Sequence, residues 1–239
     1  MFADSDDYLP CDALQTVLNI ITSKKADIVQ ASWYTDTNGV IKKNKRLIKS
    51  KQFNNESAIE AFLNFRMLGG YIWSKLYRTE VIKNIEFPTD MSLGEDGVFA
   101  FRAFLNAKSV AYVSIPIYYY RIRQNSLTMR ESVDFCDRNL DVFKQIDYIH
   151  KALEEKNQLV KHENSEKVFD FALSLEAYKC LRKSDQETQI RYHDVGCRLK
   201  QTCDNLWKIV LASSFNPRVK LQAFEYGIRH SKCPKHKES

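Results

Sequence analysis

The stretch Phe2-Ala3-Asp4-Ser5-Asp6-Asp7-Tyr8-Leu9-Pro10 concentrates acidic residues between a short apolar stub and a proline suited to a helix start. Carboxylates this close repel one another unless a positive group neutralises them. Hard divalent cations such as Mg²⁺ or Mn²⁺ prefer such oxygen ligands. Asp and Ser are also favoured at helix N-termini, where they cap the backbone. The pattern therefore predicts either a metal site at Asp4 and Asp6 or an ordinary helix start.

The composition indicates a globular protein with an uneven distribution of charge. The chain has 239 residues, of which 44% are apolar, so it can bury a sizeable core. Its net charge of +6 is too modest to indicate nucleic acid, but suits an anionic substrate or a membrane surface. Basic residues gather in 42–51 and in 216–239. No apolar run reaches the ~20 residues of a spanning helix, and the six cysteines contain no C-x-x-C pair. We expect a cytoplasmic protein, with the inner face of the membrane as a candidate surface.

The hydrophobic pattern divides the chain into an α/β region, residues 1–131, and an all-helical region, residues 132–239. The predicted elements of the first region are a helix over 10–23, a strand over 26–33, a hairpin turn at Asn38-Gly39, a helix over 56–67, a short extended segment over 71–77, a short helix over 79–84, a helix carrying Phe99, Phe101 and Phe104, and strands over 109–113 and 117–122. Apolar residues at helical spacing predict four helices in the second region, the last opening at Pro217.

Two further clusters contain side chains that could take part in chemistry. Glu95 and Asp96 follow Gly94, where they either occupy the first turn of a helix or supply a general base within reach of a hydroxyl. Arg121 and Arg123 alternate at a strand end and therefore point the same way. Such a pair can grip diphosphate oxygens in charge-assisted hydrogen bonds, or can be a solvated strand end stacked on tyrosines.

A fourth cluster, Trp73-Ser74-Lys75-Leu76-Tyr77-Arg78, places an aromatic ring beside a lysine. Trp73 and Lys75 suit sugar stacking and a hydroxyl or phosphate contact, or they are simply core residues. Taken in order, D-S-D-D-Y-L-P, W-x-K-L-Y-R, G-E-D-x-x-F and Y-Y-Y-R-x-R-x-x-S resemble the family-two nucleotide-sugar glycosyltransferases with the GT-A fold. The resemblance is closest to bacterial members that build capsule, exopolysaccharide or cell-wall glycans, and it covers residues 1–131.

The resemblance implies an inverting, metal-dependent transfer of a sugar from a nucleotide-diphosphate donor to a hydroxyl of a glycan or lipid-linked acceptor. It also implies a mixed sheet with flanking helices, followed by a variable helical region. The roles that it implies are Mn²⁺ or Mg²⁺ binding for Asp4 and Asp6, the catalytic base for Asp96, acceptor orientation for Glu95, and closure over the donor diphosphate for Arg121 and Arg123. Some family members carry a histidine near these arginines as a further metal ligand, and this chain has none there.

The resemblance implies an N-terminal nucleotide-binding segment before the D-x-D, and we expect it to be missing here, because only three residues precede Asp4. A start codon placed too late, a split or decayed gene and a deliberate fragment would each explain this. The expectation is therefore a truncated GT-A domain with unpaired sheet edges, which alone is poorly stable or self-associated and has little activity. The alternative to an enzyme is an inactive remnant or a non-catalytic partner subunit. A basic amphipathic helix over 217–230 is a candidate membrane contact that would suit a lipid-linked acceptor. Nucleic-acid binding is not expected.

Overall fold

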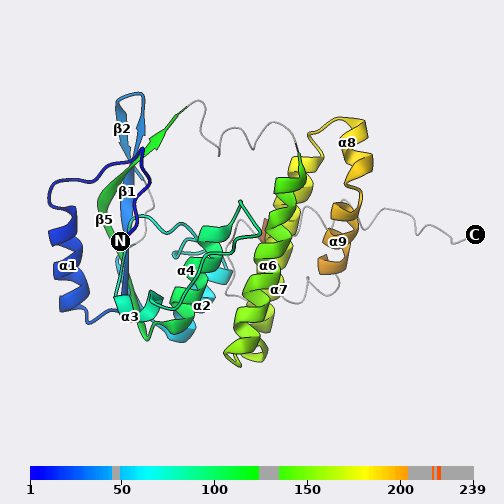
Figure 1. Ribbon diagram of the computed structural model, residues 1–239. Coiled ribbons are helices and arrows are strands. Elements are labelled where there is room, and N and C mark those ends of the chain that lie inside the picture. The colour runs from blue at the N-terminus through cyan, green and yellow to red at the C-terminus, as the bar shows by residue number, and fades with distance from the viewer. Residues whose placement is uncertain (45–48, 124–134, 204–216, 218–219, 222–239) are drawn as a thin grey trace, which may run out of the picture.

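The computed structural model describes residues 1–44, 49–123, 135–203, 217 and 220–221. Strands and helices mix through the first part of the chain, and the elements described from residue 137 to residue 203 are all helical (Figure 1). The elements are α1 (Ala13–Ser23), β1 (Ile28–Thr37), β2 (Val40–Lys43), β3 (Lys51–Asn54), α2 (Asn55–Leu63), β4 (Lys75–Tyr77), α3 (Thr79–Ile82), α4 (Glu95–Asn106), β5 (Ser109–Ile122), a 3₁₀ turn η1 (Asp137–Leu140), α6 (Asp141–Glu155), α7 (Leu159–Leu181), α8 (Gln186–Arg191) and α9 (Asp194–Cys203). The predicted fold class, an α/β region followed by helices, is confirmed. The helix predicted from Pro217 and the basic tail lie largely outside the described residues.

The sheet is mixed, with the strand order β2-β1-β5-β3. Its two long strands, β1 and β5, run parallel, whereas β2, β3 and β4 each pair antiparallel with their neighbours. The β1–β2 hairpin turns at Asn38-Gly39 as predicted, because both residues adopt the positive φ that this turn requires (52° and 83°). β4 pairs with the first half of β1 and β2 with its second half, so they share one edge of β1.

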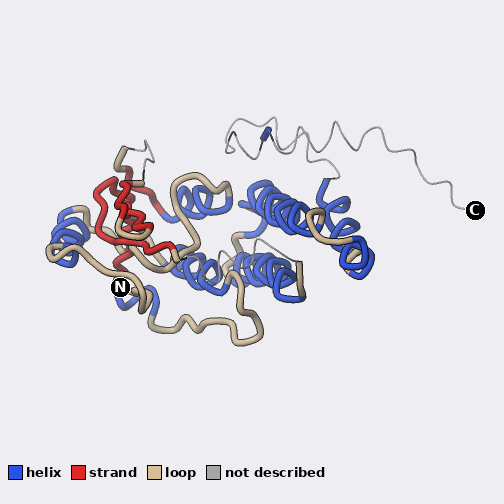
Figure 2. The backbone as a smooth tube through the Cα atoms, turned by 90° about the horizontal axis from the view of Figure 1, so that it is seen from above, coloured by secondary structure: helices blue, strands red, loops and turns tan. Residues whose placement is uncertain are grey.

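Helices cover both faces of the sheet, as Figure 2 shows from above. One face packs on α1 through Val17 and Ile21, which meet Val29 and Val113. The other face carries Ile28 and packs on α2 and α4. These opposite placements of Ile28 and Val29 follow from the alternation of side chains along a strand.

Asn55, the first residue of α2, fixes that helix to the end of α4. Its side-chain amide donates to the carbonyl oxygens of Phe104, Leu105 and Ala107 at 2.8–3.1 Å. These carbonyls lie at the C-terminus of α4, where a helix leaves backbone acceptors without internal partners. The two helices on this face are therefore joined by polar as well as apolar contacts.

Two predicted boundaries differ from the structure. The helix predicted from Pro10 begins at Ala13, because Pro10 first forms a single turn whose carbonyl accepts the Ala13 N–H at 3.1 Å. The two strands predicted over 109–113 and 117–122 form one strand, β5, interrupted by an irregularity. Its register against β1 jumps from Val113 to Pro116, since proline has no N–H for the ladder.

Two helices of the second region, α6 and α7, pack on the α/β part through one shared core. Ile146 and Ile149 of α6 and Phe169 of α7 belong to the same cluster of buried residues as Phe62 and Phe101. α6 and α7 lie side by side next to α2 and α4 in both views (Figures 1 and 2). The helical region is therefore attached to the sheet side of the molecule by buried apolar surface.

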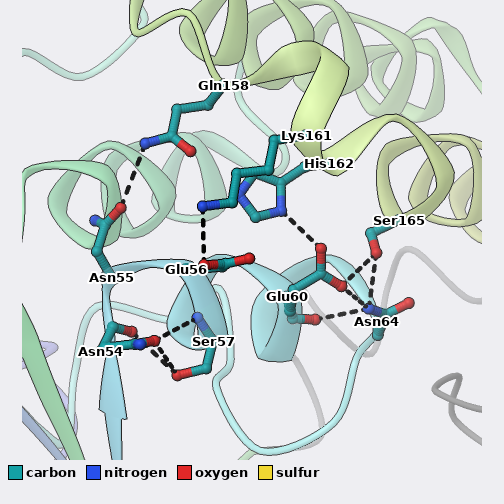
Figure 3. Close-up of polar contacts among 10 residues, drawn as sticks. All are labelled: Asn54, Asn55, Glu56, Ser57, Glu60, Asn64, Gln158, Lys161, His162 and Ser165. Carbon is teal, nitrogen blue, oxygen red and sulfur yellow. Dashed lines mark hydrogen bonds and ion pairs between the residues drawn. The ribbon is translucent and has the colours of Figure 1, made fainter.

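Polar contacts reinforce the α2–α7 junction (Figure 3). His162 is fully buried, and its Nδ1 lies 2.6 Å from Oε1 of Glu60. Ser165 donates to Glu60 Oε2 at 2.5 Å, and Asn64 donates to the same oxygen at 3.0 Å. The pKa of Glu60 is lowered: burial alone would raise it, but the contacts with His162, Ser165 and Asn64 outweigh burial. Across the described ranges, no helix is both long and apolar enough to span a membrane.

Candidate active site

The acidic N-terminal stretch forms a turn that is anchored at one end to the segment before β4 and at the other end to β5. Phe2 makes a parallel bridge with Trp73, and its ring packs edge-on against Phe99 with centroids 5.2 Å apart. Tyr8 makes an antiparallel bridge with Tyr119 of β5. Between these anchors, the Asp7 N–H donates to the Asp4 carbonyl at 3.1 Å, closing the turn. The stretch is therefore not the N-terminus of α1, which begins at residue 13.

Asp4 lies where the turn meets β5. Its backbone N–H donates to the hydroxyl of Tyr118, a buried residue, at 3.0 Å. Burial and the neighbouring carboxylates of Asp7 and Asp6 raise the pKa of the Asp4 carboxyl. Asp4 thus carries negative charge that its surroundings disfavour, and a bound cation would relieve that cost.

Asp96 lies in the first turn of α4, next to the segment before β4. Gly94, with φ of +88°, precedes this helix, and Gly97 lets a neighbouring backbone approach closely. A Cβ on Gly70 would lie 3.1 Å from the Gly97 Cα, so the two backbones are in contact. This contact brings the Ile72 backbone to Asp96, to which it hydrogen-bonds.

The environment of Asp96 raises its pKa to about 6. Burial is the main cause, and the negative charges of Glu95 and Asp4 add to it. The Ile72 hydrogen bond and the positive charge of Lys75 oppose the rise. Because the Asp4 charge contributes to the raised pKa of Asp96, the two carboxylates are close enough to interact electrostatically although they are far apart in the sequence.

The segment between α2 and β4 is held in place by Gln30 of β1, which is fully buried. Its amide donates to the Met67 carbonyl at 3.0 Å and to the Tyr71 hydroxyl at 2.8 Å. Its carbonyl oxygen accepts the Gly69 N–H at 3.0 Å. Every polar group of this buried side chain is therefore used to fix the segment that approaches Asp96. Sequence reasoning missed Gln30, and its only signal is a polar residue inside an apolar strand.

Trp73 is partly buried among aromatic rings, and Lys75 is fully buried beside one of them. Trp73 stacks on Tyr71, Tyr118 and Tyr120 at centroid distances of 4.3, 4.9 and 5.2 Å. Lys75 has no exposed surface, and its ammonium donates to the Tyr71 carbonyl and lies 3.6 Å from the centroid of the Tyr71 ring. In this arrangement Lys75 acts on the site through its charge, which lowers the pKa of Asp96.

The two arginines at the end of β5 each lie beside a carboxylate. Side chains alternate along a strand, so Arg121 and Arg123 lie on the face of Tyr119, away from the face on which Trp73 packs. Arg121 Nε lies 3.8 Å from Asp36 Oδ2, and its guanidinium lies 5.1 Å from the Tyr8 ring centroid. Arg123 Nε lies 3.6 Å from Asp6 Oδ2. The structure thus brings Arg123 to the acidic turn, whereas it pairs Arg121 with a residue of β1.

Three residues that support this arrangement had no assigned role in the sequence. Asp7 accepts the Arg121 N–H at 2.8 Å and so ties the acidic turn to β5. The Tyr8 hydroxyl donates to Asp36 Oδ2 at 3.0 Å, and the Tyr8 ring stacks on Tyr119 with centroids 4.4 Å apart. Asp7 could have been found from its place in the acidic run. Tyr8 and Asp36 carry no sequence signal, because their contact depends on the tertiary fold.

The carboxylates present fit a divalent cation only in part. Asp4 and Asp6 offer hard oxygen ligands, but Asp6 pairs with Arg123. Within the described ranges, no three His, Cys, Asp or Glu side chains are grouped so as to hold a metal alone. A cation here would therefore need further oxygen ligands from water or from substrate phosphates, which is usual for Mg²⁺.

Comparisons with known proteins agree with the predicted resemblance. No family model matches the chain. The chain is 28% identical over 190 residues to "Putative glycosyltransferase EpsH" of Bacillus subtilis, covering 77% of this chain and 51% of EpsH. It is 29% identical over 126 residues to "Poly(ribitol-phosphate) beta-N-acetylglucosaminyltransferase TarS" of Staphylococcus aureus, covering 52% of this chain and 21% of TarS. It is 27% identical over 135 residues to "Glycosyltransferase GlyA" of Streptococcus pneumoniae, covering 53% of this chain and 19% of GlyA.

The chain is thus similar to bacterial glycosyltransferases, in agreement with the predicted resemblance. The chain spans about half the length of EpsH and about a fifth of TarS and of GlyA. A crystal structure of S. aureus TarS residues 1–349 in complex with UDP-GlcNAc aligns with 84% of this chain and 64% of that one, at 14% identity and a TM-score of 0.43.

Proposed function

We propose that this chain carries the catalytic and acceptor-side part of an inverting glycosyltransferase, formed by residues 1–131 and supported by the helices of 132–239. The enzyme would move a sugar from a nucleotide-diphosphate donor to a hydroxyl of a glycan or lipid-linked acceptor. It would act in bacterial surface polysaccharide synthesis, in the cytoplasm at the inner face of the membrane. The observation that supports the proposal is that Asp4, far from Asp96 in the sequence, lies near enough for its charge to raise the pKa of Asp96. The names of EpsH and TarS support the reaction class.

Asp96 is the proposed general base. Its pKa of about 6 leaves it ionised at neutral pH but more basic than an ordinary aspartate, which suits removal of a proton from a hydroxyl. Glu95 precedes it and would orient the acceptor. Attack by the deprotonated hydroxyl from the side opposite the leaving diphosphate would invert the anomeric carbon.

Asp4 is the proposed donor-side residue, together with Asp6. They would hold Mn²⁺ or Mg²⁺, which when bound supplies positive charge to the leaving diphosphate. Arg121 and Arg123 would assist only after exchanging their carboxylate partners for phosphate oxygens. Arg123 and Asp6 are both exposed by more than a third, and such ion pairs contribute at most about 1 kcal/mol, so the exchange costs little for Arg123. For Arg121 it would leave Asp36, whose side chain is only 10% exposed, with the Tyr8 hydroxyl as its hydrogen-bond donor.

Calorimetric titration with UDP-GlcNAc in the presence of Mn²⁺, followed by a transfer assay, tests these roles. We expect binding by the wild type, loss of binding in Asp4→Asn, and unchanged binding without transfer in Asp96→Asn. Transfer by Asp96→Asn at the wild-type rate would remove that residue from the role of base. Absence of heat with UDP-GlcNAc and with other UDP-sugars would favour the alternative of a non-catalytic remnant or partner subunit.

A further inference from the structure

The loop that leads into Glu95-Asp96 is held by residues from the helical region. Asp141, the first residue of α6, accepts the backbone N–H of Ser92 at 2.8 Å through Oδ2. Arg138 of η1 donates to the Ser92 carbonyl at 2.6 Å from Nη2 and at 3.2 Å from Nε. Both backbone groups of Ser92 are therefore bound by side chains that follow it by more than forty positions.

Asp90, two residues earlier in the same loop, is held by α6 as well. The Tyr148 hydroxyl donates to Asp90 Oδ1 at 2.8 Å. The Lys144 ammonium donates to the Asp90 carbonyl and lies 3.0 Å from Asp141 Oδ1. Lys144 thus joins the two anchor points of the loop.

Gln145 extends these contacts to the first turn of α4. An added Cβ on Gly94 would lie 2.6 Å from Gln145 Oε1, and one on Gly97 would lie 2.1 Å from Gln145 Nε2. The Gln145 amide therefore lies directly on the backbone on both sides of Asp96. A side chain larger than hydrogen at either glycine would displace it.

The α6 residues that make these contacts share one helical face. Asp141, Lys144, Gln145 and Tyr148 follow the spacing i, i+3, i+4, i+7, which places them in one row. Ile146 and Ile149 of the same helix are buried in the core. The helix therefore presents an apolar face to the core and a separate polar face to the loop.

Asp141 is the central member of this polar face, because it is 6% exposed and touches both Ser92 and Lys144. A buried carboxylate is costly unless hydrogen bonds and opposite charge compensate it. Here burial alone would raise its pKa, but the Ser92 N–H and the Lys144 ammonium outweigh burial and lower it. The Asp141 carboxylate is thus charged, with one oxygen bound to the Ser92 N–H and the other to the Lys144 ammonium.

We propose that Asp141 is a positioning residue, which through Ser92 and with Lys144, Gln145 and Tyr148 sets the place of Asp96 in the site. This inference rests on the proposed function, in which Asp96 is the base. The helical region then contributes to transfer without touching the substrate.

Hydrogen–deuterium exchange of the full chain tests the positioning independently of transfer. In Asp141→Asn we expect amides 92–97 to exchange about tenfold faster, the order that loss of a charge-assisted hydrogen bond produces. The matched control is Asp147→Asn, which makes the same change on α6 but affects a carboxylate that pairs with Arg198 at 3.1 Å, away from the loop. Tyr148→Phe removes only the hydroxyl that donates to Asp90 and should speed amide exchange at 90–92. This variant is the test if Asp141→Asn does not fold.

The same variants in a transfer assay separate positioning from general stability. We expect kcat to fall about tenfold in Asp141→Asn while the donor KM stays within about twofold, and Asp141→Glu to recover part of kcat. Unchanged exchange at 92–97 overturns the proposal, and so does faster exchange with wild-type kcat. If the wild type transfers no sugar, the proposed function fails, and the exchange data alone decide whether Asp141 holds the segment of Asp96.

Discussion

Replacing Asp96 by asparagine should make the protein more stable at alkaline pH. The folded protein raises the pKa of Asp96 from its ordinary value of 3.8 to about 6, mainly through burial. Holding the ionised carboxylate in this place therefore costs free energy relative to the unfolded chain. Asparagine has nearly the same shape, carries no charge, and keeps an oxygen that can accept the Ile72 hydrogen bond.

The sign and size of the effect follow from linkage. A folded-state pKa above the unfolded value means that the folded protein binds more protons between pH 4 and 6, so wild-type stability falls as pH rises through this window. The difference between 3.8 and about 6 corresponds to about 3 kcal/mol at full strength. Because Asp96 is only partly buried, solvent screening reduces this to about 1–2 kcal/mol. For a chain of this size, such a gain raises Tm by about 2–8 °C.

Urea unfolding followed by circular dichroism, at pH 4 and at pH 8, measures this difference. Asp96→Asn should exceed the wild type by about 1–2 kcal/mol at pH 8 and match it at pH 4. Glu86→Gln is the control, since Glu86 is exposed and its loss should change stability by less than about 0.5 kcal/mol at either pH. If the free energies of unfolding of Asp96→Asn and the wild type differed equally at both pH values, the fold would not disfavour the ionised carboxylate. The inference that it is a tuned base would then be refuted.

Three further outcomes are expected. The initial rate of wild-type transfer should rise with pH through about 6, as Asp96 loses its proton, and a flat profile from pH 5 to 8 would contradict this. Lys75→Met should shift that midpoint to higher pH, because the Lys75 charge lowers the pKa of Asp96; a shift to lower pH in the same rate assay would exclude the assigned role of Lys75. In urea unfolding at pH 7, Glu60→Ala should cost about 2–3 kcal/mol, because it leaves buried His162 without its partner. The control Glu56→Ala removes the exposed ion pair with Lys161, one helical turn earlier, and should lower the free energy of unfolding by less than about 1 kcal/mol (Figure 3). Equal losses of stability in the two variants would contradict the importance assigned to burial at Glu60.

Local sequence signals predicted most of the elements but not how they join. The Asn38-Gly39 turn and the helix containing Phe99 and Phe104 were predicted, because each depends on residues close in sequence. β5 was predicted as two strands, since Pro116 interrupts the strand pattern. Its continuity depends on pairing with β1, which tolerates the irregularity by shifting register, and no local pattern records that.

The candidate site was predictable as a set of residue types rather than as a geometry. The acidic turn and Glu95-Asp96 were singled out, and Asp4 lies near enough to Asp96 for its charge to raise the pKa of Asp96. The partner of Arg121 was not predictable, because Asp36 comes from a strand whose alternation is broken by the register shift. The enclosure of Trp73 by three tyrosines likewise depends on which strands become neighbours.

The helical region is tied to the site by two kinds of contact with different consequences. Its apolar contacts, such as Ile149 and Phe169 within the core of α2 and α4, determine whether the fold holds together. Its polar contacts, centred on Asp141, determine where the loop before Asp96 lies. The energy of a hydrogen bond depends sharply on distance and angle, whereas the hydrophobic stabilisation from buried apolar surface is not directional. A substitution on the polar face of α6 can therefore change the position of the proposed base while the core stays intact. By the same reasoning, sequence differences in the helices of related proteins can alter the rate of transfer even where the site residues are the same.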